Sequence, residues 1–197
     1  MAVLTLPLPP VPNLPRGQLL TAIQRCVRDW AQAWAVQNGI ALPAGAQYLS
    51  YPAVPCQTEG SILTSIQNLI VQTLTTQAIP LPTGPLYKPL VMGNYQPNNV
   101  ILTAIQRLLV AWLNHVALPV PVGPQYLALP SVPNQSEGDI LTSIQNILVA
   151  IRPFAAVSFN APNDQMYRAL PTGNYQTDNY ILTSIQNQWS ALALYSL

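Results

Sequence analysis

The sequence predicts a mainly α-helical chain with Pro-rich extended connectors, built from five tandem repeats of about 40 residues. Three observations support this fold class. A seven-residue motif recurs five times, a residue suited to a helix start precedes each motif at a fixed distance, and apolar residues follow it at helical spacing. Each repeat is therefore expected to be an extended Tyr/Pro segment followed by a short amphipathic helix.

The repeated motif reads ILTSIQN at 62–68, 140–146 and 181–187, ILTAIQR at 101–107 and LLTAIQR at 19–25. Its threonine recurs at intervals of 43, 39, 39 and 41 residues, at Thr21, Thr64, Thr103, Thr142 and Thr183. Intervals of this size are typical of repeat proteins. We divide the chain into 1–38 (a Pro-rich arm and the first helix), 39–78, 79–116, 117–155 and 156–197.

A residue suited to a helix start stands six positions before each motif threonine: Pro15, Thr58, Pro97, Ser136 and Thr177. The hydroxyls of Thr58, Ser136 and Thr177 are predicted to cap their helices by accepting from backbone N–H groups of the first turn. Proline is expected at the first helical position, where its missing N–H costs nothing. The next position carries an acid in three copies, Glu59, Glu137 and Asp178, which suits the positive end of a helix dipole.

Apolar residues recur one position before the threonine and two, six and nine after it, which is the spacing of a helix-packing stripe. The predicted helix-interface residues are Leu20, Ile23, Leu63, Ile66, Leu102, Ile105, Leu141, Ile144, Leu182 and Ile185. Helices of roughly 14–18 residues are marginal alone in water, so this face needs a partner. The partner is either another helix of the same chain or the same helix of another chain.

The segments between the helices are rich in proline and tyrosine. Proline spacing excludes central strands and favours extended chain, with short strands expected at 47–51 and 125–129 and turns at 93–95 and 173–175. A tyrosine stands sixteen residues before the threonine in four copies: Tyr48, Tyr87, Tyr126 and Tyr167. These tyrosines either buttress each connector against its helix or contact a sugar or peptide ligand.

Composition narrows the function classes. Seven basic and six acidic residues among 197 give a net charge of +1, which provides no basic face for nucleic acid. So little charge favours a surface that partners largely cover. No run of about 18 apolar residues predicts a membrane span, and no basic leader precedes the Pro-rich N-terminus, so synthesis in the cytoplasm without secretion is expected.

The sequence contains no catalytic, cofactor-binding or metal-binding pattern, and we expect no enzyme. His115 is the only histidine, which excludes histidine metal clusters and paired acid–base schemes. Cys26 and Cys56 occupy different positions of the repeat and are interpreted as two unpaired thiols packed as small hydrophobic side chains.

The pattern QSEGDILTSIQN at 135–146, a capped acidic helix start after a Pro/Tyr-rich segment, resembles short modules in structural proteins of tailed bacteriophages. The chain departs from those modules by little charge in its helices and by proline at positions 15 and 97. The resemblance implies a non-enzymatic virion protein, made in the host cytoplasm, whose partners are other virion proteins and copies of itself.

Two forms of such a protein are expected. A tail-fibre or baseplate element, slightly favoured, would pair identical helices in a trimer, whereas a capsid cement protein would fold its five helices together. The alternative function is a soluble glycan- or peptide-binding module that uses the four tyrosines.

Overall fold

The computed structural model describes residues 15–42, 58–90, 96–116, 136–151 and 177–195. These residues form α1 (Arg16–Gln37), α2 (Glu59–Thr76), the short 3-10 helix η2 (Pro85–Tyr87), α3 (Asn98–His115), α4 (Glu137–Ile151) and α5 (Asp178–Tyr195). They contain no strand, so the prediction of a mainly helical chain is confirmed for the described part. The strands expected at 47–51 and 125–129, and the turns at 93–95 and 173–175, lie outside the described residues.

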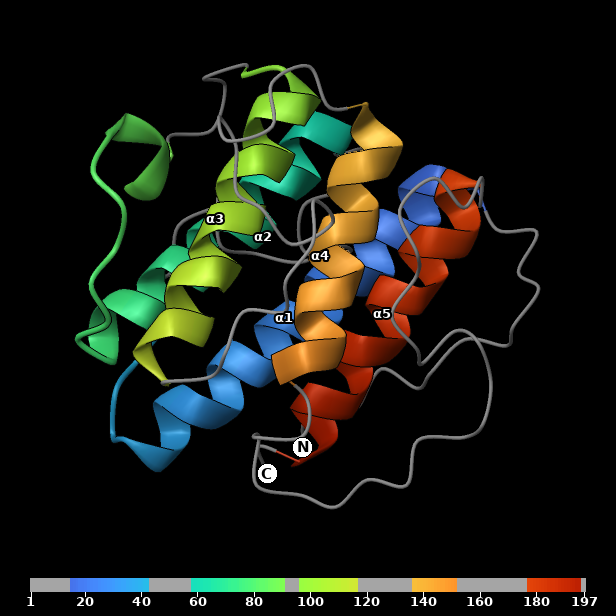
Figure 1. The fold of residues 1–197 in the computed structure, drawn as a ribbon. Coiled ribbons are helices and arrows are strands. Elements are labelled where there is room, and N and C mark those ends of the chain that lie inside the picture. Colours follow the sequence, from blue (N-terminus) through green and yellow to red (C-terminus); the bar gives the residue numbers. More distant parts are fainter. Residues whose placement is uncertain (1–14, 43–57, 91–95, 117–135, 152–176, 196–197) are drawn as a thin grey trace.

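The five α-helices form a closed ring, in which each helix packs on the next and α5 packs on α1 (Figure 1). All five run in the same direction. Arg16, at the start of α1, forms ion pairs with residues at the starts of α2, α4 and α5. A Cβ atom on Gly60, in the first turn of α2, would lie 3.6 Å from Asn98 Oδ1 at the start of α3. The molecule is therefore a parallel five-helix bundle.

The parallel arrangement explains the long intervals between helices. The 18 residues of α2 span about 27 Å, so the chain must travel back that far before α3 can start beside it. Extended chain at about 3.3 Å per residue needs at least eight residues for this return. The 21 residues between Thr76 and Asn98 are ample, whereas antiparallel neighbours need only about 2–8.

The core is layered across the bundle. The residues directly before the motif threonine form a layer of five leucines, Leu20, Leu63, Leu102, Leu141 and Leu182. The residues two positions after it form a layer of five isoleucines, Ile23, Ile66, Ile105, Ile144 and Ile185. None of the ten is more than 3% exposed, and burial of each side chain contributes about 1.5–3 kcal/mol. The stripe that the sequence predicts for helix packing thus packs within one chain.

Side-chain caps start three of the helices. Thr58 Oγ1 accepts from Ser61 N at 3.2 Å, and Thr177 Oγ1 accepts from Tyr180 N at 3.4 Å. At the start of α4, Ser136 and Asp139 cap the helix reciprocally. Asp139 N donates to Ser136 Oγ, and Ser136 N donates to Asp139 Oδ2. This reciprocal arrangement is a capping box, and it satisfies N–H groups that have no partner inside the helix.

The expected position of proline was wrong by one residue. Pro15 and Pro97 are the N-cap residues themselves, and α1 and α3 begin one residue later. Their ψ of 144° is not helical, yet their carbonyls already accept the first helical bonds, from Leu19 N and Ile101 N. Proline fits this place because its fixed φ is compatible with the N-cap and the cap's own N–H is not needed by the helix.

The C-terminal ends of α1 and α2 share one geometry. Gly39 after α1 has φ 66° and Ala78 after α2 has φ 56°, both in the left-handed region. In each case the next residue's N–H, at Ile40 or Ile79, donates to a carbonyl five residues back, at 2.8 and 3.0 Å. This is the Schellman ending of a helix, in which glycine is normally preferred because it has no Cβ.

Candidate functional site: the bundle interior and its N-terminal end

A small cavity of about 20 Å³ lies among the helices. Its walls are the ten side chains of the leucine and isoleucine layers together with Trp189. A buried water needs two or more polar partners, and these walls are apolar side chains. The cavity therefore favours apolar contents, and its lining has no group for acid–base or nucleophilic chemistry.

Tryptophans fill the part of the core beyond the isoleucine layer. Trp30 lies between Trp112 and Trp189, with ring centroids 5.2 Å apart in both pairs and tilted rings. These residues come from α1, α3 and α5. Tilted aromatic pairs at this distance contribute beyond their buried area. The leucine layer and the isoleucine layer thus have the same residue type on all five helices, whereas the tryptophan-containing part of the core differs from helix to helix.

Buried glutamines link neighbouring helices around the ring. Gln106 Nε2 donates to Ser143 Oγ on α4 at 2.9 Å, and Gln145 Nε2 donates to Ser184 Oγ on α5 at 3.0 Å. All four side chains are fully buried. Each glutamine stands three residues after its motif threonine, and each serine one residue after the threonine of the next copy. The bond therefore forms in two of the three places where the next copy has serine; at the third, the buried Oγ of Ser65 has no hydrogen-bond partner.

Where the next copy has alanine, the glutamine finds another partner. Ala104 replaces the serine opposite Gln67, whose amide donates to Lys88 O at 3.2 Å. Ala22 replaces the serine opposite Gln186, whose amide lies 3.6 Å from Cys26 Sγ. Sequence reasoning missed this network. The sequence did contain a signal for it, because all five motifs have a glutamine next to the apolar stripe, and a glutamine there needs a hydrogen-bond partner when it is buried.

The segment between α2 and α3 is held by side chains from both helices. Asn68 on α2 exchanges two hydrogen bonds with the backbone of Leu90, at 2.7 and 2.6 Å. Arg107 on α3 donates to the hydroxyl of Tyr87 at 2.7 Å. Tyr87 is only 6% exposed and belongs to the core. The other predicted tyrosines, Tyr48, Tyr126 and Tyr167, lie outside the described residues.

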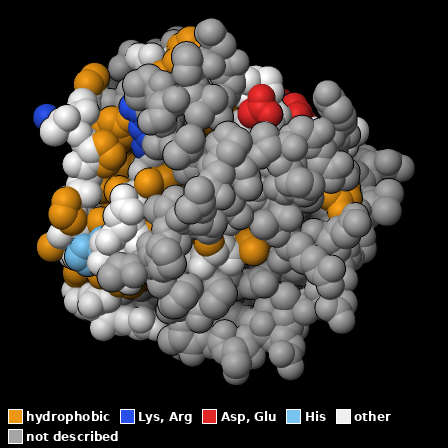
Figure 2. Space-filling view, viewed as in Figure 1, with side chains coloured by type: hydrophobic (Ala, Val, Ile, Leu, Met, Phe, Trp, Pro, Cys, Tyr) orange, Lys and Arg blue, Asp and Glu red, His pale blue; other side chains and the backbone are white. Residues whose placement is uncertain are grey.

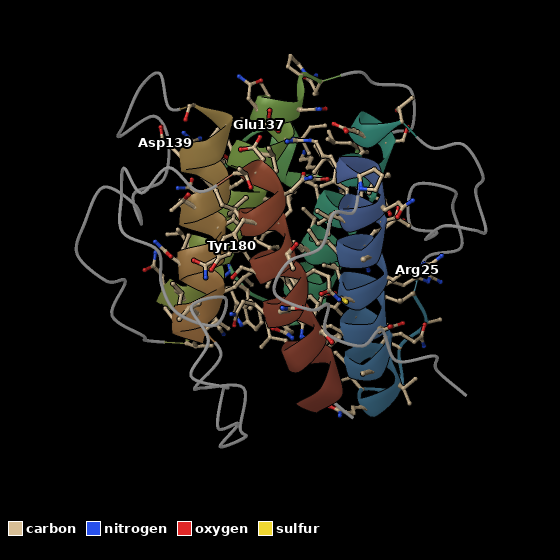
Figure 3. The ribbon with its side chains drawn as sticks, turned by 90° about the vertical axis from the view of Figure 1, so that its right-hand side faces the viewer. Arg25, Glu137, Asp139 and Tyr180 are labelled. Atoms are coloured by element: carbon tan, nitrogen blue, oxygen red, sulfur yellow. The ribbon has the colours of Figure 1, made fainter. Side chains whose placement is uncertain are left out.

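One arginine joins three acids at the N-terminal end of the bundle. Arg16 Nε lies 3.1 Å from Glu59, Nη1 lies 3.0 Å from Asp178, and Nη2 pairs with Glu137. These residues and Asn98 occupy the same position in the five copies, and we call the five the charge ring. Acidic side chains emerge near the starts of α4 and α5 in Figure 2. Glu137 is labelled at that end of the bundle in Figure 3.

The charge ring is partly shielded from water. The Arg16 side chain is 23% exposed, and the three acids are 34–44% exposed. Burial lowers the pKa of the Arg16 guanidinium, but attraction to Glu137 and Glu59 outweighs burial, so the net effect raises the pKa. The sequence analysis predicted that these acids stabilise the positive ends of the helix dipoles, but it did not predict that all three bind Arg16.

The remaining candidates for chemistry lie apart from one another. His115 is exposed in the last turn of α3, whereas Cys26 is fully buried in α1. Cys56 lies outside the described residues. Among the residues that the structure describes, no group of three or more His, Cys, Asp or Glu side chains is arranged to hold a metal ion. No helix in these parts is long and apolar enough to cross a membrane.

Comparisons with protein-family models, curated proteins and solved structures give no match for this chain.

Proposed function

We propose that this protein is a non-enzymatic structural component of a tailed-phage particle, a repeat protein that mediates contacts between subunits. The observation that carries the proposal is that every helix uses its apolar stripe inside the chain, which makes a self-contained bundle. With only 13 charged residues in 197, the exterior of such a body is suited to contact with other proteins. The resemblance of 135–146 to phage modules is the reason to propose a virion.

In this proposal each repeat has two roles. Its helix supplies one leucine and one isoleucine to the common core, and its Pro/Tyr-rich segment returns the chain in extended form to the N-terminal end. Part of the described stretch 79–90 supports this division, because Gln67 and Asn68 of α2 bond to the backbone of Lys88 and Leu90, which follow the 3-10 helix η2.

The intramolecular core favours the cement form over the fibre. A threefold fibre needs an apolar helix face that is free to meet the same face of two other chains. Here the residues of that face are at most 3% exposed within one chain. We therefore propose a monomeric body that clamps other virion proteins, in place of the trimer that the sequence slightly favours.

Two measurements test this function. Light scattering of the purified chain is expected to give a monomer of 21.4 kDa, and a stable trimer would contradict the cement form. Mass spectrometry of gradient-purified particles from cells that carry the gene is expected to find the protein at a fixed ratio to the major shell protein. Absence from particles when the protein is abundant in the same lysate would contradict a virion role.

The alternative, a glycan- or peptide-binding module, gains no support at Tyr87, which is the one of the four predicted contact tyrosines that lies within the described residues. Tyr87 is buried, and its hydroxyl is bonded to Arg107 on α3. This geometry is that of a buttress, which packs a connector onto its helix.

A further inference from the structure

The dipeptide Asn38-Gly39 follows the last turn of α1 and is the only Asn-Gly pair in the sequence. Both residues are exposed, and a Cβ atom placed on Gly39 would meet no atom within 4 Å, so solvent reaches the pair. The chain leaves α1 here, at the lower edge of the bundle in Figure 1. Glycine has no side chain to hinder a reaction at its own backbone nitrogen. This position therefore combines an accessible side-chain amide with an unhindered backbone nitrogen.

The folded end of α1 holds these two groups apart. The ψ of Asn38 is 5°, so the Gly39 nitrogen is nearly eclipsed with the backbone nitrogen of Asn38 and is turned away from its Cβ. Asn38 Nδ2 donates to Trp34 O at 2.8 Å, and Gly39 N donates to Val36 O at 3.2 Å. Both hydrogen bonds must break, and ψ must rotate, before the Gly39 nitrogen can reach Asn38 Cγ. The groups therefore react only when the last turn of the helix opens.

We propose that Asn38 is a modification site, at which the side-chain amide is lost spontaneously through a succinimide when the last turn of α1 opens. The Gly39 nitrogen gives its proton to water and forms a bond to Asn38 Cγ. The bond between Cγ and Nδ2 breaks, and ammonia leaves with a proton taken from water. Water then opens the ring at either of its two carbonyl carbons, which yields aspartate or isoaspartate. Nothing is oxidised or reduced, and water is the only co-reactant.

Either product weakens the end of α1. The new carboxylate has no donor for Trp34 O, and it adds a negative charge at the negative end of the helix dipole. Isoaspartate also lengthens the main chain between positions 38 and 39, which disturbs the 2.8 Å bond from Ile40 N to Ala35 O. The reaction therefore favours the opening of the same turn that slows it. The inference depends on the end of this helix and not on the proposed virion role.

Peptide mapping of the full chain by mass spectrometry, repeated over time at mildly alkaline pH, tests the proposal. The mass gain that accompanies replacement of an amide by a carboxyl is expected at Asn38, and a protein isoaspartyl methyltransferase should methylate the isoaspartate product. Because two hydrogen bonds must open first, the rate should be about 5- to 100-fold slower than in a synthetic peptide of residues 34–42. Asn38→Gln is the matched control, because its longer side chain must close a larger ring, and position 38 should then gain no mass.

A second variant tests whether the helix end controls the rate. Ile40→Pro removes the N–H that bonds to Ala35 O, so the reaction in the full chain should become about 2- to 10-fold faster relative to a peptide with the same substitution. An unchanged ratio would overturn the proposed control.

Two results with the unaltered chain would overturn the proposal whether or not the variants fold. The first is a reaction at Asn38 more than about 1,000-fold slower than in the peptide, which exceeds what two hydrogen bonds at a helix end can cause. The second is an equal rate in the full chain and in the peptide, which would mean that the end of α1 does not restrain the site.

Discussion

Replacement of Arg16 by methionine tests whether the charge ring stabilises the bundle. Methionine keeps much of the length and apolar stem of the arginine but removes the charge and all the donors. Three carboxylates on α2, α4 and α5 would then face one another without a cation between them. We expect the variant to fold, because the leucine and isoleucine layers are untouched, but with a lower free energy of unfolding.

The magnitude follows from the geometry and exposure of the three pairs. Exposed ion pairs contribute about 0.2–1 kcal/mol each. The acids here are 34–44% exposed while the arginine is 23% exposed, so we place the network at about 1–3 kcal/mol in total. The positive ends of the helices still attract the acids after the substitution, which keeps the loss from being larger.

The free energy of unfolding would be measured by urea denaturation in low and high sodium chloride. Salt screens attraction in the unaltered chain and repulsion in Arg16→Met, so the salt dependence should change sign. Lys88→Met is the matched control, since it removes the same charge from an exposed side chain. Equal stability and equal salt dependence of the two variants would refute the reasoning.

The pH dependence of the Arg16 contribution has a definite sign. The pKa of Arg16 is raised in the folded state, so its contribution is fully present below the unfolded pKa and declines only as the pH rises past it. The difference between the unaltered chain and Arg16→Met should therefore show no loss due to this group between neutral and mildly alkaline pH. A difference that disappears by pH 9 would contradict this.

Four further substitutions test other contacts, and the effect of each on the free energy of unfolding would be measured by urea denaturation. Ser143→Ala removes the buried acceptor of Gln106 and should cost about 1–2 kcal/mol; an unchanged value would mean that the amide finds another partner. Ala78→Gly should stabilise the chain by about 0.5–1 kcal/mol and Gly39→Ala should destabilise it by about 1 kcal/mol, so effects of equal sign would exclude the left-handed helix endings as the cause. Tyr87→Phe should cost about 0.5–1.5 kcal/mol through loss of the hydroxyl bonded to α3, whereas lost glycan or peptide binding at unchanged stability would favour a ligand contact.

The helix starts and packing faces could be predicted because each depends on residues that are close in sequence. Thr58 and Ile66, for example, lie within nine positions of one another. The 3.6-residue period of the helix then determines which residues after the cap lie on the buried face. The one-residue error at Pro15 and Pro97 has a local origin as well. Proline fits both the N-cap and the first helical position, and only the backbone angles separate them.

The direction and order of the helices could not be read from the repeats. Identical motifs do not reveal which copies become neighbours, and an apolar stripe packs in parallel or antiparallel pairs. The interval lengths did carry a signal, since about 20 residues are more than an antiparallel turn requires. Arg16 was missed for a related reason. Its role depends on four helix starts that meet in space, although 162 residues separate it from Asp178.

The charge ring also explains why five similar helices are written in one chain. In a symmetric assembly of five identical chains every position of such a ring would hold the same residue, so five acids or five arginines would face one another. A single chain escapes this rule and places one arginine, one asparagine and three acids around the same circle. Alanine at 22 and 104 amid serines at 65, 143 and 184 is a second departure from symmetry, which a ring of five identical chains could not have. Because the five copies belong to one chain, cationic, anionic and neutral side chains can lie next to one another in the charge ring.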